Sequence, residues 1–80
     1  MIDKLHRILI EALESRSYVR LRVKRYGSMC YLVISLAREE HVFVDKAGKQ
    51  VAYRHAWQAR RWLKQRFAIP EIEVEVEIVR

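Results

Sequence analysis

The sequence predicts a small α+β protein with a five-stranded, mainly antiparallel sheet and two helices packed on one face of it. Three observations support this fold class. Two segments space their apolar residues as amphipathic helices do, several short segments alternate apolar and polar residues, and short turns connect them. The expected order is helix, four strands, helix, strand. Because the 80 residues contain no linker-like stretch, we expect one domain, residues 1–80.

Residues 2–14 have the spacing of an amphipathic helix. Apolar side chains recur every three or four positions, and Asp3 lies in the first turn, where a carboxylate interacts favourably with the helix dipole. We expect this helix to cover one face of the sheet. Its apolar residues are Ile2, Leu5, Ile8, Leu9, Ala12 and Leu13.

Residues 18–26 and 29–37 form the clearest pair of strands. The two residues between them are Gly27 and Ser28, and glycine in the first position is typical of a type II′ hairpin turn. If Tyr26 lies opposite Met29, the apolar residues of both strands fall on one face. The predicted apolar pairs are Val19 with Leu36, Leu21 with Ile34 and Val23 with Leu32.

The rest of the chain supplies two short strands and a second helix. Strands near residues 41–44 and 50–53 flank a turn at residues 45–48, and a helix spans residues 55–68. This helix ends before Pro70, because the residue preceding a proline avoids helical backbone angles. Its narrow apolar stripe consists of Ala56, Ala59, Leu63 and Phe67.

The stretch VFVDKAGKQVAYRHAWQARRWL contains a D-x-x-G turn, an aromatic–arginine pair and a helix with spaced alanines. This pattern resembles small bacterial proteins of unknown function, in which a helix and a hairpin precede the same elements. The resemblance covers about residues 18–66, implies the same fold and brings no activity with it. His55 stands where the helix of such proteins often begins with serine. The residues that carry the resemblance are Asp45, Gly48, Tyr53, Arg54, Ala56, Ala59 and Leu63.

Residues 71–79, EIEVEVEIV, alternate glutamate with aliphatic residues and form the expected last strand. The aliphatic side chains are expected to face the helices, which leaves the glutamates on the open face of the sheet. The first strand places three bases on the same face. We call these two sets the glutamate row, which is Glu71, Glu73, Glu75 and Glu77, and the basic stripe, which is Arg20, Arg22 and Lys24.

Opposite charges on neighbouring strands contribute about 0.2–1 kcal/mol per pair to the stability of a sheet. We therefore expect the last strand to lie antiparallel beside the first, in the order 5-1-2-3-4, with the glutamate row neutralising the basic stripe. Alternatively, the last strand lies beside the fourth, or it remains a free edge that pairs with its own copy or with a partner. Glutamates facing each other across a two-fold axis repel, which argues against such a homodimer. Contact of the glutamates with basic residues of another protein stays open.

The formal net charge of +6 conceals a segregation of charge along the chain. Residues 18–66 contain twelve bases and three acids, whereas residues 71–80 contain one base and four acids. A basic region suits an anionic partner, either a nucleic acid or an acidic protein surface. No apolar run is long enough to span a membrane and no signal peptide is recognisable, so we expect a cytoplasmic protein without a membrane partner.

Nothing in the sequence predicts an enzyme, a cofactor or a metal site. Cys30 is the only cysteine, and His6, His41 and His55 lie on separate elements without the spacing of metal ligands or of a catalytic triad. Cys30 lies an even number of residues from the apolar Leu32, Ile34 and Leu36, so its side chain is expected on the same face of the strand. We therefore expect Cys30 to be buried as a small hydrophobic residue. The alternative, a reactive thiol, requires the fold to bring a histidine beside it. His6 and His55 are expected at the surface.

Two surfaces are candidates for nucleic-acid binding, because basic side chains contact phosphates and aromatic rings stack on unpaired bases. One is the open face of the first hairpin, and the other is the charged side of the second helix. Trp57 and Trp62 flank the apolar stripe of that helix, where a tryptophan either seals the core or anchors an interface. The candidate residues are Tyr18, Arg20, Arg22, Lys24, Tyr26 and Tyr31 on the sheet and Trp57, Arg60, Arg61 and Lys64 on the helix.

These observations predict a non-enzymatic protein-interaction module of the bacterial cytoplasm, with nucleic-acid binding as the alternative. If the glutamate row neutralises the basic stripe, the sheet is a poor phosphate binder and the second helix is the better candidate. Phosphate binding weakens steeply with added salt, whereas binding through an apolar interface does not. Salt dependence therefore separates the two hypotheses.

Overall fold

The computed structural model describes residues 1–80 as an α+β fold with two helices and a five-stranded, mostly antiparallel sheet. This confirms the predicted fold class and the predicted order of elements. In chain order the elements are α1 (Lys4–Ser15), β1 (Arg20–Tyr26), β2 (Met29–Ser35), β3 (Glu40–Val42), β4 (Ala52–Tyr53), α2 (Ala56–Phe67), the 3-10 helix η1 (Glu71–Glu73) and β5 (Val74–Val79).

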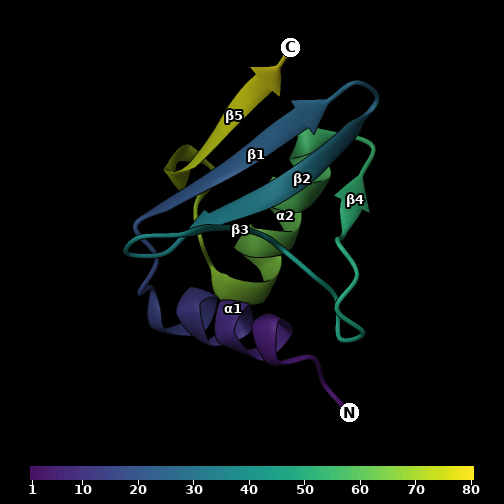
Figure 1. The fold of residues 1–80 in the computed structure, drawn as a ribbon. Coiled ribbons are helices and arrows are strands. Elements are labelled where there is room, and N and C mark those ends of the chain that lie inside the picture. The colour runs from purple at the N-terminus through teal and green to yellow at the C-terminus, as the bar shows by residue number, and fades with distance from the viewer.

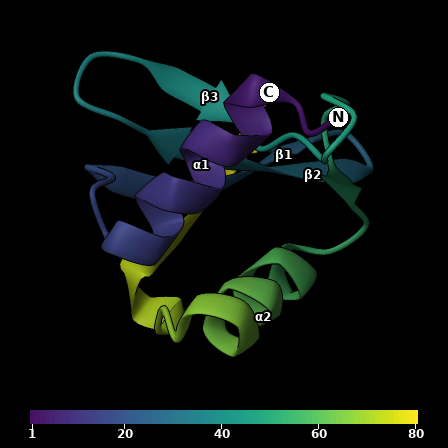
Figure 2. The same ribbon diagram turned by 90° about the horizontal axis from the view of Figure 1, so that it is seen from below.

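The two helices enclose the core from different directions. Helix α2 lies behind the sheet, and α1 crosses below the lower ends of the strands (Figure 1). Seen from below, α1 lies between β3 and α2 (Figure 2). Neither helix has the length and apolar character needed to cross a bilayer.

The β1–β2 hairpin has the predicted register. Tyr26 lies opposite Met29 and Val23 lies opposite Leu32, with Gly27 at φ +61° in the turn. The prediction was wrong at the start of the hairpin. β1 begins only at Arg20, Val19 is 72% exposed, and Tyr18 packs against the core in its place. Tyr18 and Val19 lie outside the strand, Val19 in a bend, so the alternation that puts Val19 on the apolar face does not apply to them.

The third and fourth strands differ from the predicted order, because both pair with β2. β3 pairs with residues 33–35 and β4 pairs with residues 30–31, so the order is β3-β2-β1-β5 with β4 also beside β2. Residues 44–50 leave the sheet between them and are closed by a bridge between Val44 and Gln50. The two short strands therefore follow one another along β2 and do not pair with each other.

The last strand lies beside β1, as predicted, but runs parallel to it and not antiparallel. β3 and β4 are both antiparallel to β2, so both run in the direction of β1. Helix α2 then returns the chain to the end of the sheet where β1 starts. The predicted direction was wrong because it assumed that the fourth strand runs opposite to the third, whereas β4 runs in the same direction as β3.

One hydrophobic core joins the sheet to both helices. Leu9 and Leu13 enter it from α1, and Ala59 and Leu63 enter it from α2, so that each helix contributes side chains four residues apart. Every buried residue of the protein is apolar. The remaining members of the core are Leu21, Val23, Cys30, Leu32, Ile34, Phe43, Val44, Ile69 and Val74.

The helices cover β5 less than the alternation of its sequence predicts. Val74 is buried, but Val76 is 49% exposed and Ile78 is 66% exposed. Ile72 lies in η1 and is also exposed. Helix α2 packs mainly under β1, β2 and β4, and it approaches the last segment chiefly at η1. Three of the four aliphatic side chains expected to be covered by the helices are therefore at the surface.

The turn at residues 45–48 has the chemistry of its D-x-x-G pattern. Oδ1 of Asp45 accepts hydrogen bonds from the backbone N–H groups of Ala47 at 2.9 Å and Lys49 at 3.0 Å. Gly48 has φ +85°, a conformation that only glycine adopts without steric cost. The turn is therefore stabilised by the side chain of Asp45 and by the ability of Gly48 to adopt a positive φ.

This turn docks on the start of α1. The N–H of Asp3 donates to the carbonyl of Lys46 at 2.9 Å, and the Asp3 carboxylate caps the helix by accepting from the N–H of His6 at 3.2 Å. A Cβ at Gly48 would lie 2.9 Å from Oδ1 of Asp3. The first helix and the turn after β3 therefore meet at a position where there is no room for a side chain.

We expect Gly48→Ala to lower the free energy of unfolding by about 2 kcal/mol and Gly27→Ala to lower it by about 1 kcal/mol. Both substitutions place alanine at positive φ, but a Cβ at Gly27 meets nothing within 4 Å. At Gly48 the new methyl group displaces Asp3 and weakens the helix cap. Urea denaturation followed by circular dichroism measures both losses. Equal losses for the two variants would contradict the docking of the turn on α1.

Candidate functional site

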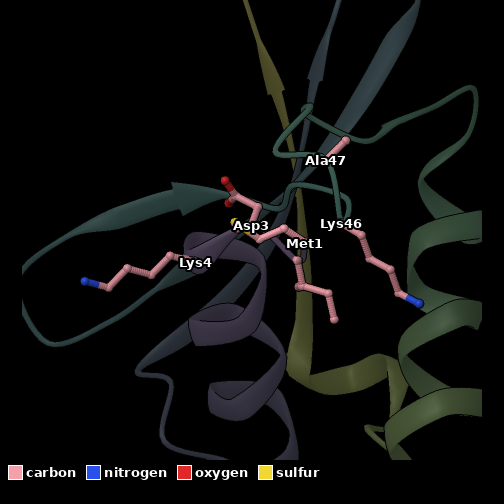
Figure 3. A pocket seen from close by; sticks show the side chains of 6 residues that line it. Met1, Asp3, Lys4, Lys46 and Ala47 are labelled. Carbon is pink, nitrogen blue, oxygen red and sulfur yellow. The ribbon is translucent and has the colours of Figure 1, made fainter.

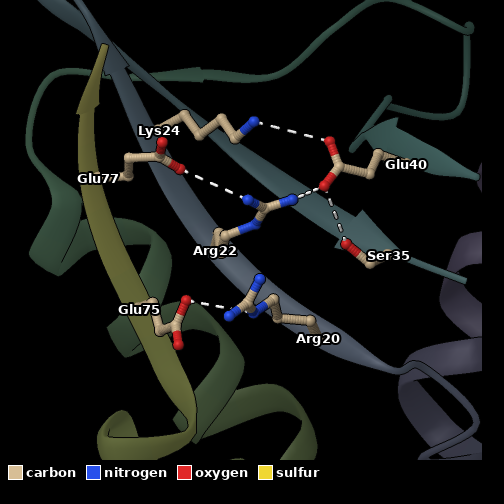
Figure 4. Close-up of polar contacts among 7 residues, drawn as sticks. All are labelled: Arg20, Arg22, Lys24, Ser35, Glu40, Glu75 and Glu77. Atoms are coloured by element: carbon tan, nitrogen blue, oxygen red, sulfur yellow. Dashed lines mark hydrogen bonds and ion pairs between the residues drawn. The ribbon is translucent and has the colours of Figure 1, made fainter.

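The basic stripe on the open face of the sheet is paired with carboxylates (Figure 4). Nε of Arg20 lies 3.3 Å from Oε2 of Glu75, and Nη1 of Arg22 lies 3.5 Å from Oε2 of Glu77. Arg22 also pairs with Glu40, whose other oxygen lies 3.6 Å from Nζ of Lys24. The side chain of Arg22 is only 14% exposed between these acids. The stripe is therefore internally neutralised.

The glutamate row is divided between two elements. Glu75 and Glu77 lie in β5 and pair with the basic stripe, as predicted. Glu71 and Glu73 lie in η1, because the chain leaving Pro70 first makes a 3-10 turn. Glu73 pairs with Arg16 at 3.6 Å, and Glu71 forms no ion pair. Only half of the predicted row therefore belongs to the sheet.

Sequence reasoning missed Glu40, which joins Arg22 to Lys24. Glu40 lies opposite Ser35 at the start of β3 and accepts a hydrogen bond from Oγ of that serine at 3.5 Å. A carboxylate at the start of the third strand predicts an ion pair with the basic stripe only if β3 is already known to pair with β2. The predicted strand, which began at residue 41, left this acid in the connection.

The aromatic residues of the hairpin separate onto different faces. Tyr31 lies opposite Lys24 on the open face, and its ring meets the edge of Tyr26 with 5.9 Å between ring centroids. Together with Val42 and Gln50, these two rings line a shallow hollow of about 350 Å³. Tyr18 packs against the core and does not join them. The sheet therefore offers two tyrosines but no unpaired cation in its basic stripe.

The solvent side of α2 combines a tryptophan with unpaired cations. We call Trp57, Arg60, Arg61 and Lys64 the cationic face of α2; these residues are spaced three or four apart along the helix. None of the four residues takes part in an ion pair, and residues 46–70 contain seven bases and no acid. Arg61 and Lys64 are exposed, and Trp57 is 55% exposed.

Arg60 differs from its neighbours on the cationic face. It is half-buried, and its Nη2 donates a hydrogen bond to the carbonyl of Glu71 at 2.8 Å. This contact ties α2 to η1 and thereby positions the start of β5. Arg60 therefore has a structural role, and the cations of this face that are free to meet a partner are Arg61 and Lys64.

The two tryptophans have different environments. Trp62 is half-buried and packs against Phe43 and Phe67, with ring centroids 5.0 Å and 5.3 Å away, so it seals the edge of the core. Trp57 is exposed and stacks nearly parallel to the ring of His55, with 6.2 Å between centroids and an interplanar angle of 11°. Trp62 therefore has the core-sealing role considered in the sequence analysis. Trp57 is exposed and remains a candidate for the other role, that of an interface anchor.

Cys30 lies in the core, and its one polar contact is with Nη1 of Arg25 at 3.5 Å. Tyr53 lies opposite it on β4, and burial raises the pKa of the Tyr53 phenol. No histidine reaches the thiol. His6, which was expected at the surface, is half-buried because Nδ1 lies 2.8 Å from the carbonyl of Val44. No group of three potential metal ligands is present.

A second hollow, of about 360 Å³, lies where the N-terminus meets the turn after β3 (Figure 3). Its lining side chains do not converge on a common point, because Lys4 and Lys46 extend in opposite directions and Asp3 points toward the turn. The hollow therefore lacks the convergent polar groups that orient a small ligand. Its lining residues are Met1, Ile2, Asp3, Lys4, Lys46 and Ala47.

No protein-family model, curated protein sequence or solved structure matches this chain.

We expect Glu40→Gln to lower the free energy of unfolding by about 1–2 kcal/mol, because it leaves Lys24 without a carboxylate and Arg22 with only one. The loss should shrink in high salt, where the remaining charges are screened. Glu71→Gln, at an acid without an ion pair, should change stability by no more than about 0.5 kcal/mol. Urea denaturation at low and high salt measures both variants. Equal effects of the two substitutions would show that Glu40 does not neutralise the basic stripe.

Proposed function

We propose that this protein is a non-enzymatic interaction module of the cytoplasm and that it binds an acidic protein surface through the cationic face of α2. The observation that carries the proposal is the division of the bases into two groups. The basic stripe is paired with Glu40, Glu75 and Glu77, whereas Arg61 and Lys64 have no carboxylate partner.

Exposed, unpaired cations are the ones that can bind an external anion at low cost. A partner that approached the basic stripe would have to displace carboxylates from guanidinium groups that are already partly desolvated. A partner that approaches α2 meets charges that are hydrated and free. The absence of acids over residues 46–70 means that no side chain of that stretch repels an incoming carboxylate.

Trp57 supports a protein partner. Tryptophan and arginine are enriched among the residues that dominate binding energy in protein interfaces, and here they lie side by side on one exposed helix face. The indole supplies apolar area, while Arg61 and Lys64 supply charge complementarity at its margin. An acidic helix or loop with an apolar residue between its carboxylates has matching chemistry.

The non-enzymatic part of the proposal rests on the environment of the groups that usually carry catalysis. Cys30 is buried with Arg25 as its polar neighbour, which leaves the thiol without a base. His6 bonds to a backbone carbonyl, His41 lies 3.1 Å from Glu39, and His55 stacks on Trp57. These residues lie on separate elements and share no hollow with one another.

Nucleic-acid binding is the second candidate, and the stacked pair of His55 and Trp57 favours it. An exposed aromatic ring beside cations is the arrangement that single-stranded nucleic acids use for stacking and phosphate contacts. Seven residues of helix rise by about 10 Å, so the cationic face spans only two or three phosphates. This limited length is why a protein partner is preferred.

The test is a fluorescence-anisotropy titration with three labelled probes: a peptide that alternates glutamate with leucine, a single-stranded oligonucleotide and a double-stranded one. We expect the peptide to bind, and the double variant Arg61→Glu with Lys64→Glu to weaken this binding by at least about tenfold. Trp57→Ala should weaken it by about tenfold, as loss of an aromatic anchor does. Arg60 is left unchanged because it holds η1.

The matched control reverses two exposed, unpaired cations of α1, Lys4→Glu and Arg7→Glu, and should leave peptide binding unchanged. Repeating the titrations at about 50 mM and about 200 mM salt separates the two candidates, since oligonucleotide affinity falls steeply over this range. Salt-sensitive binding of the oligonucleotides alone would favour the second candidate. Binding of no probe, or equal weakening by both double variants, would refute the cationic face as the binding surface.

A further inference from the structure

β5 forms a free edge of the sheet. It pairs only with β1, and it lies at the margin of the molecule (Figure 1). Edge strands present unpaired N–H and C=O groups that can bind another strand. The opposite edge is interrupted, because β3 and β4 are three and two residues long and residues 43–51 separate them. The six consecutive residues of β5 are therefore the longer template.

The two faces of this edge differ in chemistry. Glu75 and Glu77 lie on the open face, and their side chains remain 56% and 49% exposed despite their ion pairs. On the face turned toward the helices, Val76 and Ile78 are exposed because α2 does not extend beneath them. A strand laid along β5 would therefore meet carboxylates on one face and bury aliphatic side chains on the other.

A second copy of this chain does not suit this edge. Opposite residues on paired strands share a face, so every register that joins the aliphatic sides of two β5 strands also sets glutamate against glutamate. Like charges placed directly opposite destabilise a pair of strands. Glu75 and Glu77 thus oppose self-association while leaving the edge open to a strand of opposite charge.

The inner side of β5 already shows which pattern it accepts. β1 offers it Arg20 and Arg22 on the open face, where they pair with the glutamates of β5. On the other face β1 places Val23 beside Val76. Within the molecule, β5 therefore already pairs with a strand, β1, in which basic and aliphatic residues alternate.

We propose that the outer edge of β5 binds an extended segment of another protein in which basic and aliphatic residues alternate. The segment adds a further strand to the sheet. Its backbone pairs with β5, its bases approach Glu75 and Glu77, and its aliphatic side chains cover Val76 and Ile78. This site lies apart from the cationic face of α2 and does not depend on the function proposed for that face.

The probe is a fluorescently labelled, end-blocked peptide of sequence KVKVKVK, titrated by anisotropy with the full chain. The scrambled peptide KKKKVVV has the same charge and composition but cannot place its bases on one face, so we expect it to bind at least about tenfold more weakly. Two further peptides carry N-methyl groups on either the lysine or the valine amides. The N–H groups of the lysines and of the valines point to opposite edges of an extended peptide, and N-methylation removes them as hydrogen-bond donors. The peptide methylated on the edge that faces β5 should therefore lose binding, and the other should not.

The protein variant is Glu75→Gln with Glu77→Gln, which removes two charges from the edge and keeps the size of the side chains. It should weaken KVKVKVK binding by about tenfold. The matched control is Glu11→Gln with Glu14→Gln, two exposed acids of α1 that form no ion pair, and it should bind as the parent does. A urea denaturation midpoint for each variant checks that both remain folded at the assay temperature.

Three outcomes would overturn the proposal. Equal binding of KVKVKVK and KKKKVVV would mean that only net charge is recognised. Indifference to both N-methylated peptides would exclude strand addition. Concentration-dependent dimerisation of the parent chain in analytical ultracentrifugation, lost when Ile78→Lys is introduced, would assign the edge to a second copy. Reversal of Arg61 and Lys64 should leave KVKVKVK binding intact, which separates this site from the cationic face of α2.

Discussion

The pairing of β5 with β1 is the interaction on which the arrangement of charge in this protein depends. It places Glu75 and Glu77 beside Arg20 and Arg22, so that a strand which is basic by itself becomes part of a neutral surface. Glu40 completes the neutralisation from the other side of β1 through Arg22 and Lys24. Without β5, the open face would carry three bases and a single acid from β3. The last strand therefore decides which cations of the chain are available.

The same pairing requires α2 to be where it is. A parallel neighbour for β1 needs a connection that returns the chain to the starting end of the sheet, and α2 supplies it across the face that the core occupies. Ala59 and Leu63 bury one side of this helix, and the side chain of Arg60 links the helix to η1 through the carbonyl of Glu71. The side of the helix that faces solvent then has no element opposite it. Trp57, Arg61 and Lys64 are thus exposed because α2 serves as the connection that brings β5 parallel to β1.

Two surfaces of different character result from this arrangement. The cationic face of α2 carries unpaired positive charge around one aromatic ring, and the outer edge of β5 carries two ion-paired, half-exposed glutamates beside two exposed aliphatic side chains. A chain of 80 residues buries a smaller fraction of its surface than a large protein does, so a helix or strand that packs against the core on one side is exposed to solvent on the other.

The sequence by itself determined the elements, the hairpin register and the proximity of glutamates to arginines, because side-chain alternation and turn residues act over a few neighbouring positions. Gly27 and Ser28 set the register of β1 on β2, and the alternation of the last strand set which of its residues share a face. Only the tertiary structure decided the direction of β5, the position of β4 and the role of Glu40. Each of these depends on contacts between segments far apart in the chain: both β3 and β4 pair with β2, and this removes one reversal of direction. Local patterns carry no record of such pairings, so they left Val76 and Ile78 assigned to the core when the packing of α2 leaves them exposed.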